Sequence, residues 1–171
     1  MILFIVILII TLLDIMVAAK NENELKNLLE NKFGLAPLTG IKFAHEKYKV
    51  ESTITFQLPH NDLIYLFEVD SYNTPKVLFG EYVLLNNYLT DYSRYMFIAI
   101  QYAKAFNTDR TANHLNFARK KLGCKIPFKV FDGLSIMALA LQSNSLNIFF
   151  KKLHQEKLQY KLEKKFSSEH L

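Results

Sequence analysis

The sequence is poor in cysteine and lacks the short motifs that mark several common enzyme classes. Its single cysteine, Cys124, excludes an intramolecular disulfide and any metal site built from several cysteines. There is no glycine-rich phosphate loop, no G-x-S-x-G and no H-E-x-x-H. The five histidines are scattered, so we expect surface or turn residues rather than ligands. Internal repeats and low-complexity tracts are absent as well.

What the chain does contain is enough apolar material for one domain. Half of its 171 residues are hydrophobic and 22% are charged, a composition that argues against wholesale disorder. The charge is uneven, because residues 1–103 hold 8 Lys/Arg and 11 Asp/Glu whereas residues 104–171 hold 13 and 5, a net charge of −3 against +8. The basic half is either a solvated surface or the electrostatic footprint of a polyanionic partner.

The first 19 residues are apolar apart from one threonine and Asp14. At about 1.5 Å per residue, this length just spans a bilayer. No basic residue precedes the run and three lysines follow it, which favours a membrane anchor with the domain on the cytoplasmic face. Residues 17–19 also resemble a signal cleavage site, so secretion after cleavage stays open, as does a buried N-terminal segment.

The stretch from Tyr48 to Tyr92 predicts strand, tight turn, strand and helix. Apolar residues alternate with polar ones over Tyr48–Leu58, which is typical of a strand with one buried face. Turn formers follow, and then an apolar run predicts a central strand over Leu63–Asp70. Thr74 and Pro75 predict the N-cap and first position of the next helix.

The rest of the chain predicts alternating helices and strands. Helices are expected at residues 21–33, 108–122, 134–142 and 146 to about 166, and strands at residues 41–44, 94–102 and 126–131. This order predicts an α/β fold with a mixed central sheet of four or five strands and helices on both faces. We divide the chain into a hydrophobic segment 1–19, an α/β domain 20–143 and a basic amphipathic C-terminal helix within 144–171.

Two carboxylates at the end of the central strand are the main candidates for chemistry. Glu68 and Asp70 are two residues apart, so they project from one face of the sheet, and Glu51 lies on the neighbouring strand. Clustered carboxylates bind hard cations such as Mg²⁺, and such an ion can activate water against a phosphodiester. The alternative is a strand that ends in solvated acids.

The order of helix, strands, "TITFQL", turn, "IYLFEVD", helix, strand, helix and strand resembles the PD-(D/E)xK nuclease fold over roughly Glu22–Leu141. The segment "LFEVDSYNT" is similar to the motif region of nuclease-like domains of mobile elements, including replication-relaxation proteins. The resemblance implies Mg²⁺-dependent phosphodiester cleavage, with Glu68 as the glutamate of the E-x-K pair and Glu51 near the upstream acid. Asp70 stands where lysine is expected, the upstream proline-aspartate is absent, and Lys76 would have to replace the lysine spatially.

Basic residues are the expected contacts to nucleic acid. Arg119, Lys120, Lys121 and Lys125 gather around the end of one predicted helix, and six lysines line the last helix. We expect the first group to bind phosphates, since lysine and arginine release counterions there, and to follow the sheet end that carries the acids. The competing hypothesis is a membrane-anchored interaction protein without an active site, whose basic last helix contacts anionic lipid or a partner. An active nuclease and a catalytically degenerate binder both stay open.

Overall fold

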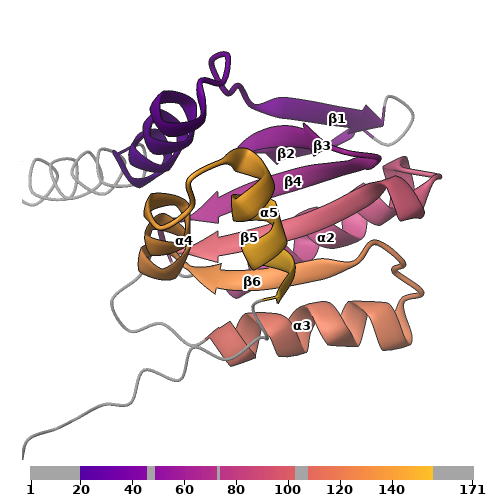
Figure 1. Cartoon of the computed structure of the whole chain (residues 1–171). Coiled ribbons are helices and arrows are strands. Elements are labelled where there is room, and N and C mark those ends of the chain that lie inside the picture. Colours follow the sequence, from indigo (N-terminus) through magenta and orange to yellow (C-terminus); the bar gives the residue numbers. More distant parts are fainter. Residues whose placement is uncertain (1–19, 46–48, 73, 103–107, 156–171) are drawn as a thin grey trace, which may run out of the picture.

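The computed structural model describes residues 20–45, 49–72, 74–102 and 108–155, and its strands form two sheets (Figure 1). The smaller sheet is an antiparallel pair of β1 (Ile41–His45) and β2 (Val50–Ile54). The main sheet has the strand order β3-β4-β5-β6. Its strands are β3 (Phe56–His60), β4 (Leu63–Asp70), β5 (Tyr95–Gln101) and β6 (Phe128–Asp132). Because β3 is antiparallel to β4 while β4, β5 and β6 are parallel, the main sheet is mixed.

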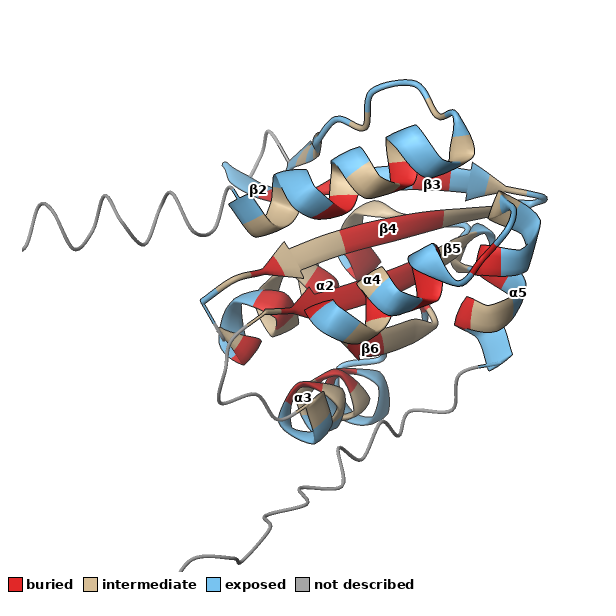
Figure 2. Cartoon of the chain, turned by 60° about the vertical axis from the view of Figure 1, so that its left-hand side comes forward, coloured by how far each residue is buried: buried red, intermediate tan, exposed pale blue. Residues whose placement is uncertain are grey.

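Helices cover both faces of the main sheet, and Figure 2 shows the buried residues gathered on the inner strands and the inward sides of the helices. One face carries a helix over residues 20–33 together with α4 (Gly133–Leu141) and α5 (Leu146–Gln155). The other carries α2 (Pro75–Tyr88) and α3 (Thr108–Lys121). A short 3-10 turn, η1 (Tyr92–Arg94), leads into β5. The predicted α/β fold with a mixed sheet and helices on both faces is confirmed.

The predicted N-terminal segment 1–19 lies outside the described residues, as does the predicted last helix beyond residue 155. Among the residues that the structure does describe, no helix has the length and apolar character needed to cross a bilayer.

The main sheet separates two hydrophobic cores. Tyr65 and Phe67 of β4 belong to the core under the N-terminal helix, α4 and α5, whereas Leu66 belongs to the core under α2 and α3. Successive side chains of a strand point to opposite faces, so β4 is buried on both sides as predicted. The described part of the tail, α5, completes the first core with its buried Phe149 and Phe150.

The prediction of one continuous strand over Tyr48–Leu58 is wrong. Its first residue lies outside the described residues, and a bend at Thr55 divides the remainder into β2 and β3, which belong to different sheets. Ile54 packs in the core of α2 and α3, whereas Phe56 packs in the opposite core. A regular strand would place both residues on one face, so the bend turns the chain over.

The hairpin between β3 and β4 is tight. Pro59 lies within β3, where it is tolerated because β3 is an edge strand of the main sheet. Asn61 has a φ of 53°, a left-handed conformation that asparagine adopts more readily than most residues. His60 therefore pairs directly with Leu63 across a two-residue turn.

Candidate functional site

The carboxyl ends of β4, β5 and β6 meet at one edge of the main sheet, the edge where open α/β sheets commonly bind ligands. Asp70 of β4 is in register with Gln101 of β5, and Gln101 is in register with Asp132 of β6. The first residues of α2, α3 and α4 follow these strand ends along the chain. Asp132 caps α4, because its Oδ1 accepts a hydrogen bond of 2.8 Å from the Ser135 amide.

Asp70 is buried, and both of its carboxylate oxygens accept hydrogen bonds. Oδ1 accepts from the Tyr72 amide at 2.9 Å and from Thr74 Oγ1 at 2.9 Å. Oδ2 accepts from the Thr74 amide at 2.6 Å and from Gln101 Nε2 at 3.0 Å. A carboxylate has about four acceptor sites, so these four bonds use its capacity. Thr74 is the N-cap residue of α2 and Pro75 its first residue, as predicted, although the Thr74 hydroxyl donates to Asp70 rather than capping the helix.

The hydrogen bonds of Asp70 continue into the sheet. Gln101 Oε1 accepts a hydrogen bond of 2.6 Å from Thr111 Oγ1, at the start of α3. Gln101 and Thr111 are 1% and 0% exposed, so this chain of polar groups is buried. Such groups must find partners inside the protein, and here the partners tie β4, β5 and α3 together. Sequence reasoning missed both residues, since no local pattern distinguishes them.

Glu68 holds the strand bend. Its Oε2 accepts hydrogen bonds from the Thr55 amide at 3.0 Å and from Thr55 Oγ1 at 3.2 Å, and that hydroxyl accepts from the Val69 amide at 3.0 Å. Burial raises the pKa of Glu68 to about 8, against the opposing effect of the Thr55 hydrogen bonds; the charge of Glu81 adds to the rise. Glu68 is therefore largely uncharged at neutral pH.

The acids whose charges reach Glu68 are Glu81 of α2 and Glu22 of the N-terminal helix, not Glu51. Glu81 accepts a hydrogen bond from the buried Ser52 hydroxyl. Glu51 precedes Ser52 on β2 and forms an ion pair with Lys42 in which both side chains are more than half exposed. Within the described ranges, no three or more His, Cys, Asp or Glu side chains are grouped so that they could hold a metal ion. The expected convergence of Glu51 with the two strand-end acids is not formed.

The described residues at this edge do not fit a Mg²⁺ ion. Mg²⁺ takes charged oxygen ligands with free lone pairs. Asp70 has its oxygens engaged in four internal hydrogen bonds, and Glu68 is largely uncharged at neutral pH. Lys76 is exposed in the first turn of α2, and no ion pair joins it to a described residue. Mg²⁺-dependent hydrolysis by Glu51, Glu68, Asp70 and Lys76 stays a prediction.

Four basic residues lie at the other end of the sheet. We call them the basic cluster: Arg119, Lys120, Lys121 and Lys125. Helix α3 returns alongside the parallel strands, so its last turn lies near the amino ends of β5 and β6 (Figure 1). A strand of seven residues such as β5 is about 23 Å long, and this length separates the cluster from the acids. The expectation that the cluster follows the sheet end with the acids is wrong.

The basic cluster is exposed, and α2 holds the loop that carries its last residue, Lys125. None of its four side chains forms an ion pair with any residue that the structure describes. The buried Asn86 of α2 accepts, through its Oδ1, hydrogen bonds from the amides of Lys125 at 2.6 Å and Ile126 at 2.9 Å. The Lys125 amine lies 5.3 Å from the centroid of the Tyr92 ring, a cation–π distance. Helix α2 therefore positions the loop that carries Lys125.

Comparison of the chain with protein-family models, with curated proteins and with solved structures found no match. Geometry alone defines its class. It is an α/β domain whose sheet-edge acids are hydrogen-bonded internally and whose exposed bases gather at the opposite end of the strands.

Proposed function

We propose that this chain is a nucleic-acid-binding domain, in which the basic cluster contacts the phosphate backbone and the sheet-edge acids stabilise the fold. The observation that carries this proposal is the exposure of Arg119, Lys120, Lys121 and Lys125 together, without an ion-pair partner among the described residues. Cationic side chains of this kind neutralise phosphates and release counterions.

The topology supports the resemblance to the PD-(D/E)xK fold. A helix precedes antiparallel strands, α2 crosses over, and β5 then pairs parallel to β4. The surroundings of Glu68 and Asp70 favour a domain that binds nucleic acid without hydrolysing it. The residue hydrogen-bonded to Glu68 is Thr55, at the bend between β2 and β3, rather than an acid, and Asp70 holds the loop that leads to α2.

The test compares two variants that each remove two exposed lysine charges. Lys120→Ala/Lys121→Ala removes half of the basic cluster, and Lys32→Ala/Lys42→Ala removes two lysines of the N-terminal half. We expect the first variant to weaken binding of the full chain to a labelled DNA duplex and to lower the salt slope by about 2, roughly 1 per lost phosphate contact. We expect the second variant to bind like the wild type.

Equal losses of DNA affinity in the two variants contradict the proposal, because they would show that binding depends on net charge alone. Absence of DNA binding at low salt together with binding to anionic lipid vesicles favours the membrane-anchored interaction protein instead.

A further inference from the structure

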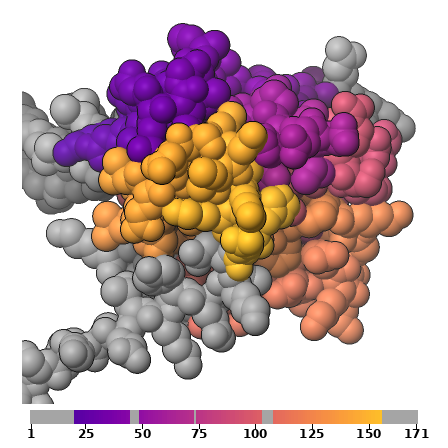
Figure 3. Space-filling model, viewed as in Figure 1, coloured from indigo at the N-terminus to yellow at the C-terminus, as the bar shows by residue number. Residues whose placement is uncertain are grey.

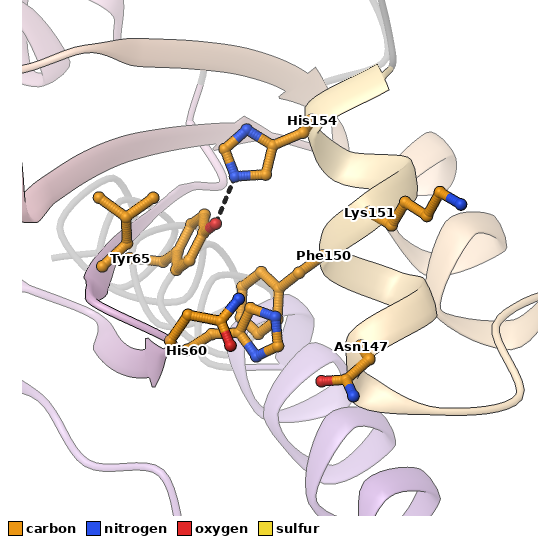
Figure 4. A pocket seen from close by; sticks show the side chains of 8 residues that line it. His60, Tyr65, Asn147, Phe150, Lys151 and His154 are labelled. Atoms are coloured by element: carbon orange, nitrogen blue, oxygen red, sulfur yellow. Dashed lines mark hydrogen bonds between the residues drawn. The ribbon is translucent and has the colours of Figure 1, made fainter.

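A pocket of about 330 Å³ opens between the β3–β4 turn and α5 (Figure 4). Figure 3 shows α5 on the surface of this face of the molecule, next to the residues of β3 and β4. The side chains that matter for its chemistry are His60, Tyr65, Asn147, Phe150, Lys151 and His154. The pocket lies on the face of the sheet that α4 and α5 cover, whereas the basic cluster lies in the last turn of α3 and just after it, on the other face.

Aromatic rings line the pocket. The ring of His60 is stacked on Phe150, with centroids 4.3 Å apart and an interplanar angle of 16°. Tyr65 packs on the same Phe150 ring at 4.2 Å. Because Phe150 is only 1% exposed, the planar surface that a ligand meets here is His60, itself partly exposed. Planar bases stack on such rings with little dependence on their identity.

The polar groups around these rings are imidazoles, amides, a hydroxyl and a lysine amine. His154 forms a hydrogen bond through Nε2 with the Tyr65 hydroxyl, drawn as a dashed line in Figure 4. Lys151 stands at the rim, one turn before His154 on α5. The amine of Lys129, on β6, donates to the carbonyl oxygens of Leu153 and His154. No carboxylate lines the pocket among the described residues, so its ligand should be an anion or rich in acceptors.

We propose that this pocket binds one nucleotide, with the base stacked on His60 and the phosphate beside Lys151 and His154. The volume lies at the lower end of the range for small-molecule pockets, about 300–1,000 Å³, which suits a single nucleotide rather than a longer segment. The stacking ring holds the base whatever its identity, and Lys151 together with protonated His154 holds the phosphate. The nucleotide is either a free mononucleotide or the end of a strand. Because the basic cluster lies on the other face, the pocket does not depend on the proposed duplex contact.

Binding of a phosphate here is coupled to a proton. Burial lowers the pKa of His154, and the charges of Lys129 and His60 lower it further. The groups around His154 are the Tyr65 hydroxyl of β4, His60 of β3 and Lys129 of β6, all neutral or cationic. Lys151 of its own helix lines the pocket as well, with its amine directed away from His154 in Figure 4. A bound phosphate places a negative charge beside His154 and so favours its protonated form. The affinity for the phosphate therefore rises as the pH falls from about 8 to about 6.

Calorimetric titration of adenosine 5′-monophosphate into the full chain tests the proposal. We expect tighter binding at about pH 6 than at about pH 8, and at least about tenfold weaker binding of adenosine or inorganic phosphate alone. Lys151→Ala should lower the affinity about three- to tenfold. Lys152→Ala is the matched control, because its amine donates to the Gln142 carbonyl and does not line the pocket. His60→Ala removes the stacking ring and should cause a loss of about tenfold.

Absence of binding at about pH 6, or equal losses in Lys151→Ala and Lys152→Ala, overturns the proposal. Lys151 is an exposed rim residue, so its variant keeps the test valid even where His60→Ala fails to fold. Titration of a 5′-phosphorylated oligonucleotide distinguishes the two possible ligands, a free mononucleotide and the end of a strand. If His60→Ala weakens its binding as much as that of the mononucleotide, the pocket takes a strand end; if only the mononucleotide is affected, the ligand is the free nucleotide.

Discussion

The two ends of the parallel strands use their polar side chains in opposite ways. At the carboxyl end, Asp70, Gln101 and Thr111 are buried and hydrogen-bonded to one another. At the amino end, the basic cluster is exposed. A buried polar group is costly unless it has partners inside the protein, whereas an exposed charge is solvated and can bind a partner. The polar groups at the carboxyl end are therefore structural because they are buried and hydrogen-bonded. The bases at the amino end are exposed and can bind a partner.

The largest effect is expected at the carboxyl end, from Asp70→Ala. This substitution leaves four donors without their acceptor, so we predict a loss of about 3 kcal/mol in the free energy of unfolding measured with urea. Glu51→Ala is the matched control, because its exposed ion pair with Lys42 is worth less than about 1 kcal/mol. Similar losses in both variants would mean that Asp70 is an ordinary surface acid.

The next effect concerns the pH dependence of stability. The pKa of Glu68 is about 8 in the folded protein against 4.5 for an unperturbed glutamate, so the folded state binds more protons between these values. Stability should therefore fall as the pH rises through this window, on the order of 2 kcal/mol in total, and level off above the folded pKa. Urea unfolding across the window should show this fall in the wild type and a reduced fall in Glu68→Gln. Equal pH dependence of stability in the two proteins would contradict the assignment of the raised pKa to Glu68.

A smaller effect is expected where α2 supports the basic cluster. Asn86→Ala removes the acceptor of the Lys125 and Ile126 amides, which should cost about 1–2 kcal/mol of stability and weaken DNA binding. The neighbouring Asn87→Ala removes only an exposed hydrogen bond to the Val83 carbonyl and should cost less than about 0.5 kcal/mol. Unchanged DNA binding in folded Asn86→Ala would show that the loop conformation does not matter for the contact.

Local patterns predicted much of the fold. The apolar run of β4 and the turn residues around it gave its bounds, because propensity and burial agree there. The last helix was predicted to be amphipathic, and three residues of its described part, α5, are buried.

The sites could not be predicted in the same way, because their contacts join residues far apart in the chain. The bend at Thr55 depends on Glu68, 13 residues later, and Asp70 meets Gln101 31 residues later. His154 and Tyr65, the hydrogen-bonded pair of the pocket beside α5, are 89 residues apart. Only the folded topology places such pairs together.

The most direct test of the division between structural acids and binding bases is the affinity for a short DNA duplex as a function of Mg²⁺ concentration. Binding through the basic cluster predicts that Mg²⁺ weakens the complex, because the ion competes for the phosphates as a counterion. The duplex should stay intact, and Glu68→Gln should behave like the wild type. Tighter binding with Mg²⁺ and cleavage of the duplex, both lost in Glu68→Gln, would contradict this division and establish a metal-dependent nuclease.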